Sequence, residues 1–332
     1  MRTITYRDAL REAIREEMLR DERVFILGED IADYGGTYAV TKGLFEEFGE
    51  KRVRDTPLAE EVITGAAIGA ALGGLRPILE LMTINFSLLA ADLIVNSAAK
   101  LRYMFGGQPQ VPLVIRTPGG GGAQRGAQHS QMFESWYAHI PGLKVAMPAT
   151  PYDVKGMFKS AVRDPDPVLF IEHELLYNVK GEVPDEGVEY TVPLNLAEVK
   201  RPGSEVTIIT FSRMLHLSLQ AAEDLSKEGI EAEVIDMRSI RPIDIDLIVN
   251  SVKKTNRVMI AEEGWKYYGT GQGLAAIIYE HAFDYMDAPI QHVTGADVPM
   301  PYSKALERAA IPKKSDIIEA VKAIVPAALV RG

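Results

Sequence analysis

Residues 55–74 read DTPLAEEVITGAAIGAALGG, and this stretch decides much of the fold. An acidic first turn followed by small and apolar residues predicts a helix that begins near Glu60. Glycine inside a helix costs about 1 kcal/mol relative to alanine, so Gly65, Gly69 and Gly73, four residues apart on one face, require a compensating contact. We expect another backbone to approach that face closely, which places Glu60 beside a poorly solvated junction. The residues alone leave open an alternative, a solvated acid favoured by the helix dipole.

Apolar segments of strand length alternate with helix-period segments through the first half of the chain. Strands are predicted at residues 24–27, 77–81, 112–115, 143–146 and 168–171, and helices are predicted to begin near Tyr6, Thr41, Glu60, Phe86, Ser130 and Pro151. The strands are almost continuously hydrophobic, which is typical of a parallel sheet covered on both faces. The sequence therefore predicts an α/β fold.

The alternation stops in a turn-rich region and then resumes. Residues 178–204 carry two stretches rich in glycine, proline and charge, and a second series of strands and helices follows from residue 206. We predict a first domain over 1–185, a linker over 186–204 and a smaller α/β domain over 205–332. A length of 332 residues is comfortable for two domains of about 150 residues each.

Composition excludes several classes of function. The net charge is −10 and the basic residues are scattered, so we expect no nucleic-acid partner. No cysteine occurs, which excludes a disulfide framework and a thiolate nucleophile or metal site. The longest uncharged apolar run, 62–75, is shorter than the roughly 17–25 residues that span a bilayer. No signal-peptide pattern opens the sequence, so we expect no membrane segment and a cytoplasmic location.

Two further motifs suggest sites. Four glycines at 119–122 follow a predicted strand and precede His129, and ligands of open α/β sheets bind at the carboxyl ends of strands. This placement favours a functional role for His129. Asp164-Pro165-Asp166-Pro167 ends a predicted helix with two carboxylates, which suits either a hard cation or a solvated turn. The residues alone favour the turn.

Four segments together carry a family resemblance. They are Asp55–Glu60, Ala127–Gln131, Pro141–Val145 and Thr294–Tyr302. On these motifs the chain resembles the β subunits of the thiamine-diphosphate-dependent E1 component of 2-oxoacid dehydrogenase complexes, and it is most similar to the pyruvate dehydrogenase branch. The resemblance covers nearly the whole length. It implies a pyrimidine-binding α/β domain with a parallel sheet, followed by a transketolase-type C-terminal α/β domain.

The resemblance also implies roles for particular residues. Glu60 matches the glutamate that hydrogen-bonds N1′ of the aminopyrimidine of thiamine diphosphate, and Phe86 matches the aromatic residue beside that ring. His129 matches the histidine that serves the substrate intermediate and transfer to lipoamide. Asp287 matches a position that contacts the E2 core's binding domain. The family's potassium site corresponds to Leu113, Ala161, Val162, Asp164 and Asp166.

Partners follow from the same resemblance. The family's Gly-Asp-Gly motif for diphosphate and Mg²⁺ is missing here, so half of the cofactor site is expected from an E1 α subunit in a heterotetramer of two α and two β subunits. Acyl transfer then goes to the lipoyl group of E2, the dihydrolipoyl acyltransferase. Acetoin dehydrogenase β subunits share the Ala-Gln-His-Ser-Gln form and stay an alternative, as do branched-chain E1 β subunits. A non-enzymatic docking scaffold is the alternative from another class.

Overall fold

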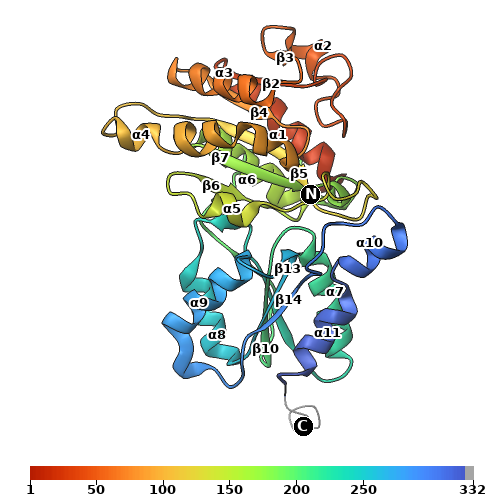
Figure 1. Cartoon of the computed structure of the whole chain (residues 1–332). Helices are drawn as coiled ribbons and strands as arrows, with labels where there is room; N and C mark the ends of the chain where they lie inside the picture. The colour runs from red at the N-terminus through yellow and green to blue at the C-terminus, as the bar shows by residue number, and fades with distance from the viewer. Residues whose placement is uncertain (326–332) are drawn as a thin grey trace. The chain divides into compact units, whose positions relative to one another are not determined.

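The computed structural model describes residues 1–325, and the chain forms two compact units (Figure 1). The first unit comprises Met1–Gly119 and Trp136–Leu194, and the second comprises Gly120–Ser135 and the residues from Asn195 onward. The predicted division was a linker over 186–204. The division after Leu194 falls inside that linker, but the glycine-rich segment 120–135, which was assigned to the first domain, groups with the second unit.

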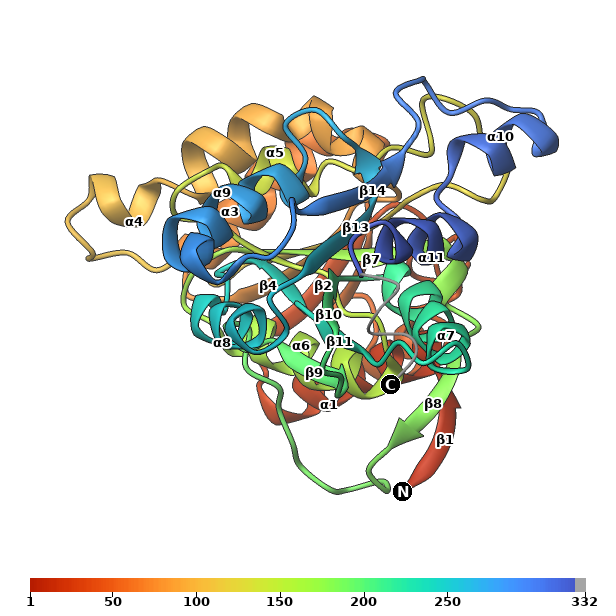
Figure 2. The ribbon, with the colours of Figure 1, turned by 90° about the horizontal axis from the view of Figure 1, so that it is seen from below.

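The first unit contains six parallel strands in one sheet and two further strands that pair separately. The strands of the unit, in chain order, are β1 (Arg2–Thr5), β2 (Val24–Gly28), β3 (Val53–Asp55), β4 (Arg76–Glu80), β5 (Val114–Gly119), β6 (Lys144–Ala146), β7 (Val168–His173) and β8 (Lys180–Val183). Within this unit the order is β6-β7-β5-β4-β2-β3, and every neighbouring pair is parallel. β1 and β8 form a separate antiparallel ribbon (Figure 2). The predicted α/β fold is confirmed.

Helices lie on both faces of this sheet. They are α1 (Tyr6–Arg20), α2 (Leu44–Phe48), α3 (Glu60–Leu72), α4 (Leu101–Met104) and α6 (Pro151–Arg163), with α5 (Glu134–Ala138) at the division and the short helices η1 (Ile84–Ala90), η2 (Leu93–Ala98) and η3 (Glu174–Leu176). Thr5 caps α1 by accepting a hydrogen bond from the Asp8 N–H, as its spacing predicts. α2 begins three residues later than predicted because Gly43, with φ of 87°, cannot be helical.

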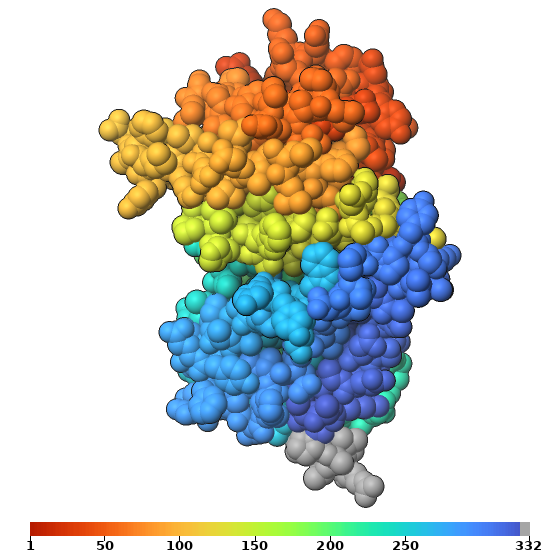
Figure 3. All heavy atoms as spheres, in the orientation of Figure 1, coloured from red at the N-terminus to blue at the C-terminus, as the bar shows by residue number. Residues whose placement is uncertain are grey.

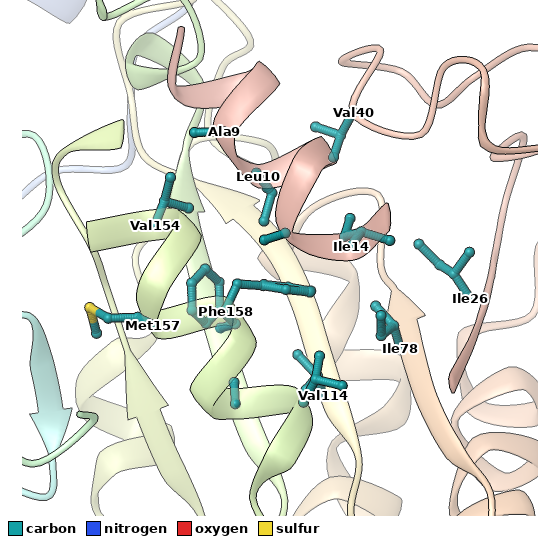
Figure 4. Close-up of a cluster of buried hydrophobic side chains, with 14 of the residues drawn as sticks. Ala9, Leu10, Ile14, Ile26, Val40, Ile78, Val114, Val154, Met157 and Phe158 are labelled. Atoms are coloured by element: carbon teal, nitrogen blue, oxygen red, sulfur yellow. The ribbon is translucent and has the colours of Figure 1, made fainter. Parts of the chain in front are cut away.

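The main core of the first unit lies between α1, α6 and the sheet (Figure 4). Leu10 of α1 and Phe158 of α6 meet Ile26, Ile78 and Val114 of three neighbouring strands, and all five side chains are buried. Because side chains alternate along a strand, Phe25 and Leu27 point to the opposite face, where α3 packs. Each fully buried large side chain contributes about 1.5–3 kcal/mol, so this face anchors the unit.

The predicted helix from Phe86 to Tyr103 is not continuous. It divides into η1, the π-helical η2 and the single turn α4, with a 72° bend between η1 and the segment that follows it. Figure 3 shows the amber segment that contains α4 standing out from the surface of its unit. Among the described residues no single helix is long and apolar enough to cross a membrane, although this bent pair passes the same test by length and composition.

The glycines of α3 differ from the expectation. Gly73 is the C-cap of the helix rather than an interior residue, and a Cβ placed on Gly69 would meet nothing within 4 Å. A Cβ on Gly65 would meet only a side-chain carbon of Leu93, at 3.3 Å. Within residues 1–325 no other backbone lies against Gly65 or Gly69, so the predicted close approach of another backbone stays a prediction for a partner chain. Glycines elsewhere in the chain are closely packed, among them Gly142, where a Cβ would lie 1.9 Å from the Ala99 carbonyl oxygen.

The second unit is a smaller α/β domain. Its strands are β9 (Glu198–Arg201), β10 (Val206–Thr210), β11 (Ala232–Asp236), β12 (Ser239–Arg241), β13 (Val258–Trp265) and β14 (Gln291–Gly295), and its helices are α7 (Met214–Ser226), α8 (Ile245–Thr255), α9 (Thr270–Ala282), η4 (Phe283–Tyr285), α10 (Lys304–Ala310) and α11 (Lys314–Lys322). The sheet order is β14-β13-β10-β11-β9, with only β9 antiparallel. α8 and α9 pack together, as do α7 and α11 (Figure 1).

Candidate functional site

Glu60 is the first residue of α3 and lies where the chain leaves β3. Its side chain is 7% exposed, and it forms no side-chain hydrogen bond or ion pair within the described part of the chain. Ala59, the N-cap, offers no side chain to the helix end, so the carboxylate of Glu60 supplies the negative charge that this end favours. The structure thus holds a nearly buried carboxylate without a partner group. Such a group is expensive to bury unless a ligand completes it.

Glu29 is a second buried acid, close to Glu60, and it was not predicted from the sequence. It follows β2 directly, is 5% exposed, and neither carboxylate oxygen forms a hydrogen bond of good geometry. Burial, and then the neighbouring Glu60, raise the pKa of Glu29 to about 7, although the nearby Ala59 N–H offsets part of the rise. With a pKa near 7, the Glu29 carboxyl group is partly protonated at neutral pH. An acid directly after a buried parallel strand was the available signal.

A third acid at the same edge of the sheet has a cationic partner. Glu80, the last residue of β4, is paired with the buried Arg116 of β5, whose guanidinium also forms hydrogen bonds of 2.7 and 2.5 Å to Glu172 of β7. The Tyr177 hydroxyl donates to Glu172 at 2.6 Å. Burial raises the pKa of Glu80, and Arg116 opposes that rise. Gly28 lets this edge close tightly, since a Cβ there would lie 2.8 Å from the Glu80 carbonyl oxygen.

Phe86 lies on η1, which packs against α3. Thr83 begins η1 by accepting a hydrogen bond from the Asn85 N–H, and Ser87 donates to the Ile84 carbonyl at 2.6 Å. Ser87 and Tyr137 also share a hydrogen bond of 2.6 Å, which fixes the helix against its unit. Phe86 itself is half-buried. The structure thus brings the helices of Phe86 and Glu60 together in the first unit.

His129 belongs to the second unit, in the glycine-rich loop of residues 120–135. Two buried carboxylates hold this loop: Glu263 accepts from the Gly121 N–H at 2.7 Å, and Glu307 accepts from the N–H groups of Gly122 and Gln124 at 3.0 and 2.9 Å. His129 is half-buried, and its own N–H donates to the Gly126 carbonyl. Both anchors were missed because they lie more than 130 residues along the chain from the loop.

The residues of the predicted potassium site do come together at the end of α6. However, Lys144 binds both carboxylate oxygens of Asp164 at 2.7 and 2.6 Å, and Arg102 binds Asp166 at 2.5 Å. Arg76 donates to the carbonyl oxygens of Val162 and Asp164. The remaining members accept backbone hydrogen bonds, Leu113 from Val168 and Ala161 from Asp164.

These contacts bear directly on the cation. Positively charged side chains already bind oxygens of Val162, Asp164 and Asp166, so in this arrangement those three members do not fit a bound K⁺. Over residues 1–325 there is also no group of three His, Asp or Glu side chains placed to hold a metal ion. The potassium site stays a prediction that the arrangement does not favour.

Asp287, the predicted partner contact, lies between η4 and β14 and is 54% exposed. Arg257 binds its carboxylate at 2.7 Å, and its backbone N–H donates to the Asn256 carbonyl at 2.9 Å. The position is therefore fixed within the second unit, with one side of the carboxylate accessible.

Comparison with known proteins places these features in a family. Residues 2–180 match the family described as "Transketolase, pyrimidine binding domain", and residues 195–317 match "Transketolase, C-terminal domain". The fold also resembles a solved structure described as "Split gene transketolase, inactive beta4 tetramer", with a TM-score of 0.80, 24% identity, and coverage of 97% of this chain and 98% of that one. At that identity the likeness shows the fold alone.

Curated relatives are closer in sequence. The chain is 52% identical to the pyruvate dehydrogenase E1 component subunit beta of Rickettsia felis, covering 97% of this chain and 98% of that protein. It is 50% identical to the mitochondrial subunit of the same name from Dictyostelium discoideum, covering 97% and 91%. It is 49% identical to the mitochondrial beta-1 subunit of Arabidopsis thaliana, covering 96% and 88%. The chain belongs to the family of pyruvate dehydrogenase E1 component β subunits.

Proposed function

We propose that Glu60 binds the aminopyrimidine ring of thiamine diphosphate, and that this chain supplies the pyrimidine half of a site for oxidative decarboxylation of pyruvate. The observation that carries the proposal is the Glu60 carboxylate, 7% exposed and without a partner group in residues 1–325. The family to which the chain belongs supports the same cofactor. When bound, thiamine diphosphate supplies the electron sink for decarboxylation.

Glu60 and Glu29 have complementary tasks in this proposal. The Glu60 carboxyl group, at the start of α3, would hold or share a proton with a ring nitrogen of the bound aminopyrimidine. Glu29, whose pKa is raised to about 7 by burial and by Glu60, is partly protonated at neutral pH. A buried carboxyl group whose pKa lies near 7 can exchange a proton with a bound base at neutral pH. Phe86, on the helix that packs against α3, offers an aromatic face to the same ring.

The remaining parts of the proposal concern partners. Relatives named as a β subunit of an E1 component support an α subunit as the partner that brings the diphosphate and Mg²⁺ half of the site. His129 is proposed to serve the substrate intermediate and acetyl transfer to the lipoyl group of E2, with Asp287 as a contact for the E2 binding domain. A bound K⁺ has the least support among the proposed ligands, because Arg76 and Lys144 already bind oxygens of its predicted site.

The test is Glu60→Ala in the reconstituted heterotetramer, with Glu61→Ala as the matched control. Glu61 is the next residue of the same helix and is exposed. We expect pyruvate decarboxylation to fall by about 10²–10⁴-fold for Glu60→Ala and to stay within twofold for Glu61→Ala. Undiminished turnover in Glu60→Ala would favour a docking scaffold. Parallel assays with pyruvate, acetoin and 3-methyl-2-oxobutanoate distinguish the substrate alternatives.

A further inference from the structure

The first part of the glycine-rich loop has a left-handed backbone at every second residue. The angle φ is 90° at Gly120, 101° at Gly122, 57° at Gln124 and 75° at Gly126. Gln124 is not a glycine, so this conformation is strained unless contacts hold it. Backbone N–H groups in turns of this kind converge on concave sites that bind anions. Residues 120–126 therefore have the backbone of an anion site.

The anion of this site comes from the second unit itself. One carboxylate oxygen of Glu307, on α10, accepts the N–H groups of both Gly122 and Gln124, at 3.0 and 2.9 Å. Glu307 is 2% exposed and forms no ion pair within residues 1–325, so these two amides are what compensates its charge. Glu263 differs, because Arg213 binds its second carboxylate oxygen at 2.8 Å. The loop and Glu307 thus depend on each other.

Apolar contacts from the same stretch of chain as Glu307 reinforce the hydrogen bonds. A Cβ on Gly121 would lie 2.9 Å from Cε of Met300 and 3.2 Å from Cδ1 of Ile311, and a Cβ on Gly126 would lie 3.1 Å from the Tyr302 ring. Figure 2 shows α10 beside the yellow segment that contains the loop. A loop that left this position would lose these contacts and leave a buried carboxylate without its donors. The second unit therefore holds the loop in one place.

His129 follows the held residues directly. Its N–H donates to the Gly126 carbonyl at 3.3 Å, so a single turn connects the histidine to the part of the loop that Glu307 binds. Ser130, the next residue, is buried, which fixes the chain on the other side of His129 as well. A displacement of the Gly122 and Gln124 amides would consequently be passed to the histidine through that turn.

We propose that Glu307 is a positioning residue for the reaction: its carboxylate is the internal anion of the glycine-rich loop and holds the conformation that places His129 for acetyl transfer. The inference rests on the proposed function of His129. Glu307 acts through the backbone of Gly122 and Gln124 and has no need to touch the substrate. A purely structural role for Glu307 predicts lower stability but no effect that depends on His129.

Kinetics of the reconstituted heterotetramer provide the first test. We expect Glu307→Ala to lower kcat for acetyl transfer to the E2 lipoyl domain by about 10–10²-fold, with a change in KM for pyruvate below about threefold, because a displaced group slows the chemical step more than binding. Glu307→Gln keeps an acceptor oxygen without the charge and should give a smaller loss. Glu319→Gln, the same change at an exposed acid, is the control and should stay within about twofold. Thermal unfolding of the full-length β subunit checks that each variant folds.

A double-mutant cycle separates positioning from general support. If Glu307 acts through His129, removing it from a chain that already lacks the histidine should cost nothing further. We therefore expect His129→Ala/Glu307→Ala to transfer acetyl groups within about twofold of His129→Ala alone. A further loss in the double variant as large as that of Glu307→Ala in the unchanged chain would refute the positioning role.

Chemical rescue tests the role of the charge. Glu307→Ala leaves the Gly122 and Gln124 amides without their acceptor, and a small carboxylate can take its place. We expect sodium formate to raise kcat of Glu307→Ala by at least about threefold over sodium chloride at equal ionic strength, and to leave the unchanged chain unaffected. Equal rates of Glu307→Ala in the two salts would refute the assignment of the carboxylate as the anion of the loop.

Failure of this inference is distinguishable from failure of the proposed function. If His129→Ala keeps its rate of acetyl transfer, the proposed role of His129 fails and the inference falls with it. If His129→Ala is slow but Glu307→Ala is not, the role of His129 stands and the positioning role of Glu307 is refuted.

Discussion

Two groups of buried glutamates lie at the carboxyl edge of one parallel sheet, and they differ in a single component. Glu80 and Glu172 share the buried guanidinium of Arg116, whereas Glu29 and Glu60 share no cation. The first group is internally compensated and suits a structural role. In the second group the pKa of Glu29 is raised to about 7, so the presence or absence of one arginine separates compensated from uncompensated acids of the same type and similar burial.

Removing the arginine should have the largest effect. Arg116→Met leaves Glu80 and Glu172 buried without their cation, and we expect a loss of about 3–5 kcal/mol in the free energy of unfolding. Urea denaturation at pH 7 measures it. Adding Glu80→Gln and Glu172→Gln to Arg116→Met should recover part of the loss. A loss below about 1 kcal/mol for Arg116→Met alone would contradict the role assigned to the guanidinium.

The second unit has a third kind of buried carboxylate: Glu307 is compensated by backbone N–H groups and not by an arginine. Glu307→Ala removes the acceptor of the Gly122 and Gln124 amides, and we expect a loss of about 2 kcal/mol with faster hydrogen exchange at these two amides. Exchange read by mass spectrometry on the 120–135 peptide checks this. Glu319→Ala, an exposed acid on α11, is the control and should leave that peptide unchanged.

Glu29→Gln tests the uncompensated group through the pH dependence of the free energy of unfolding. The pKa of Glu29 is raised to about 7 in the folded chain from 4.5, so its contribution to stability is fully present below about pH 4.5 and is lost as pH rises through 7. Glutamine cannot ionise, so the variant should be less sensitive to pH between 5 and 8 and more stable than the unchanged chain at pH 8, by about 1–2 kcal/mol. Parallel stability curves for the two proteins would refute the raised pKa of Glu29.

The smallest effect is expected where the pair is exposed. Asp287→Asn breaks the contact with Arg257, but solvent screens this pair, so the loss should stay below about 1 kcal/mol and shrink further in 0.5 M salt. Urea denaturation at two salt concentrations measures it. A loss above 2 kcal/mol would show that Asp287 is a structural residue rather than an accessible contact.

Local patterns predicted the local parts of this molecule. The hydrophobic runs located β2, β4 and β7, and the Thr5 to Asp8 spacing located the cap of α1, because those signals act within a few residues. The start of α3 at Glu60 was predicted correctly because helix-terminal signals are also local. The family match then confirmed the fold and the family that the motifs indicated.

The features that the sequence did not predict depend on contacts between residues far apart along the chain. Glu29 was missed because its pKa depends on Glu60, 31 residues further along, and the anchors Glu263 and Glu307 because the loop they hold is distant in sequence. The α3 glycines were predicted to face another backbone, but periodicity shows only which residues share a face and not what covers that face. Gly69 faces outward.

The loop over 120–135 makes the second unit discontinuous in the gene. A fragment that begins at Asn195 would keep Arg213 beside Glu263, but it would lack both backbone donors of Glu307, a residue that is only 2% exposed. Such a fragment inherits a buried charge whose backbone partners are encoded 183 and 185 residues upstream of it. A recombination event or a laboratory domain exchange that moves the C-terminal half alone therefore transfers an incomplete unit, and an intact exchange must carry both pieces.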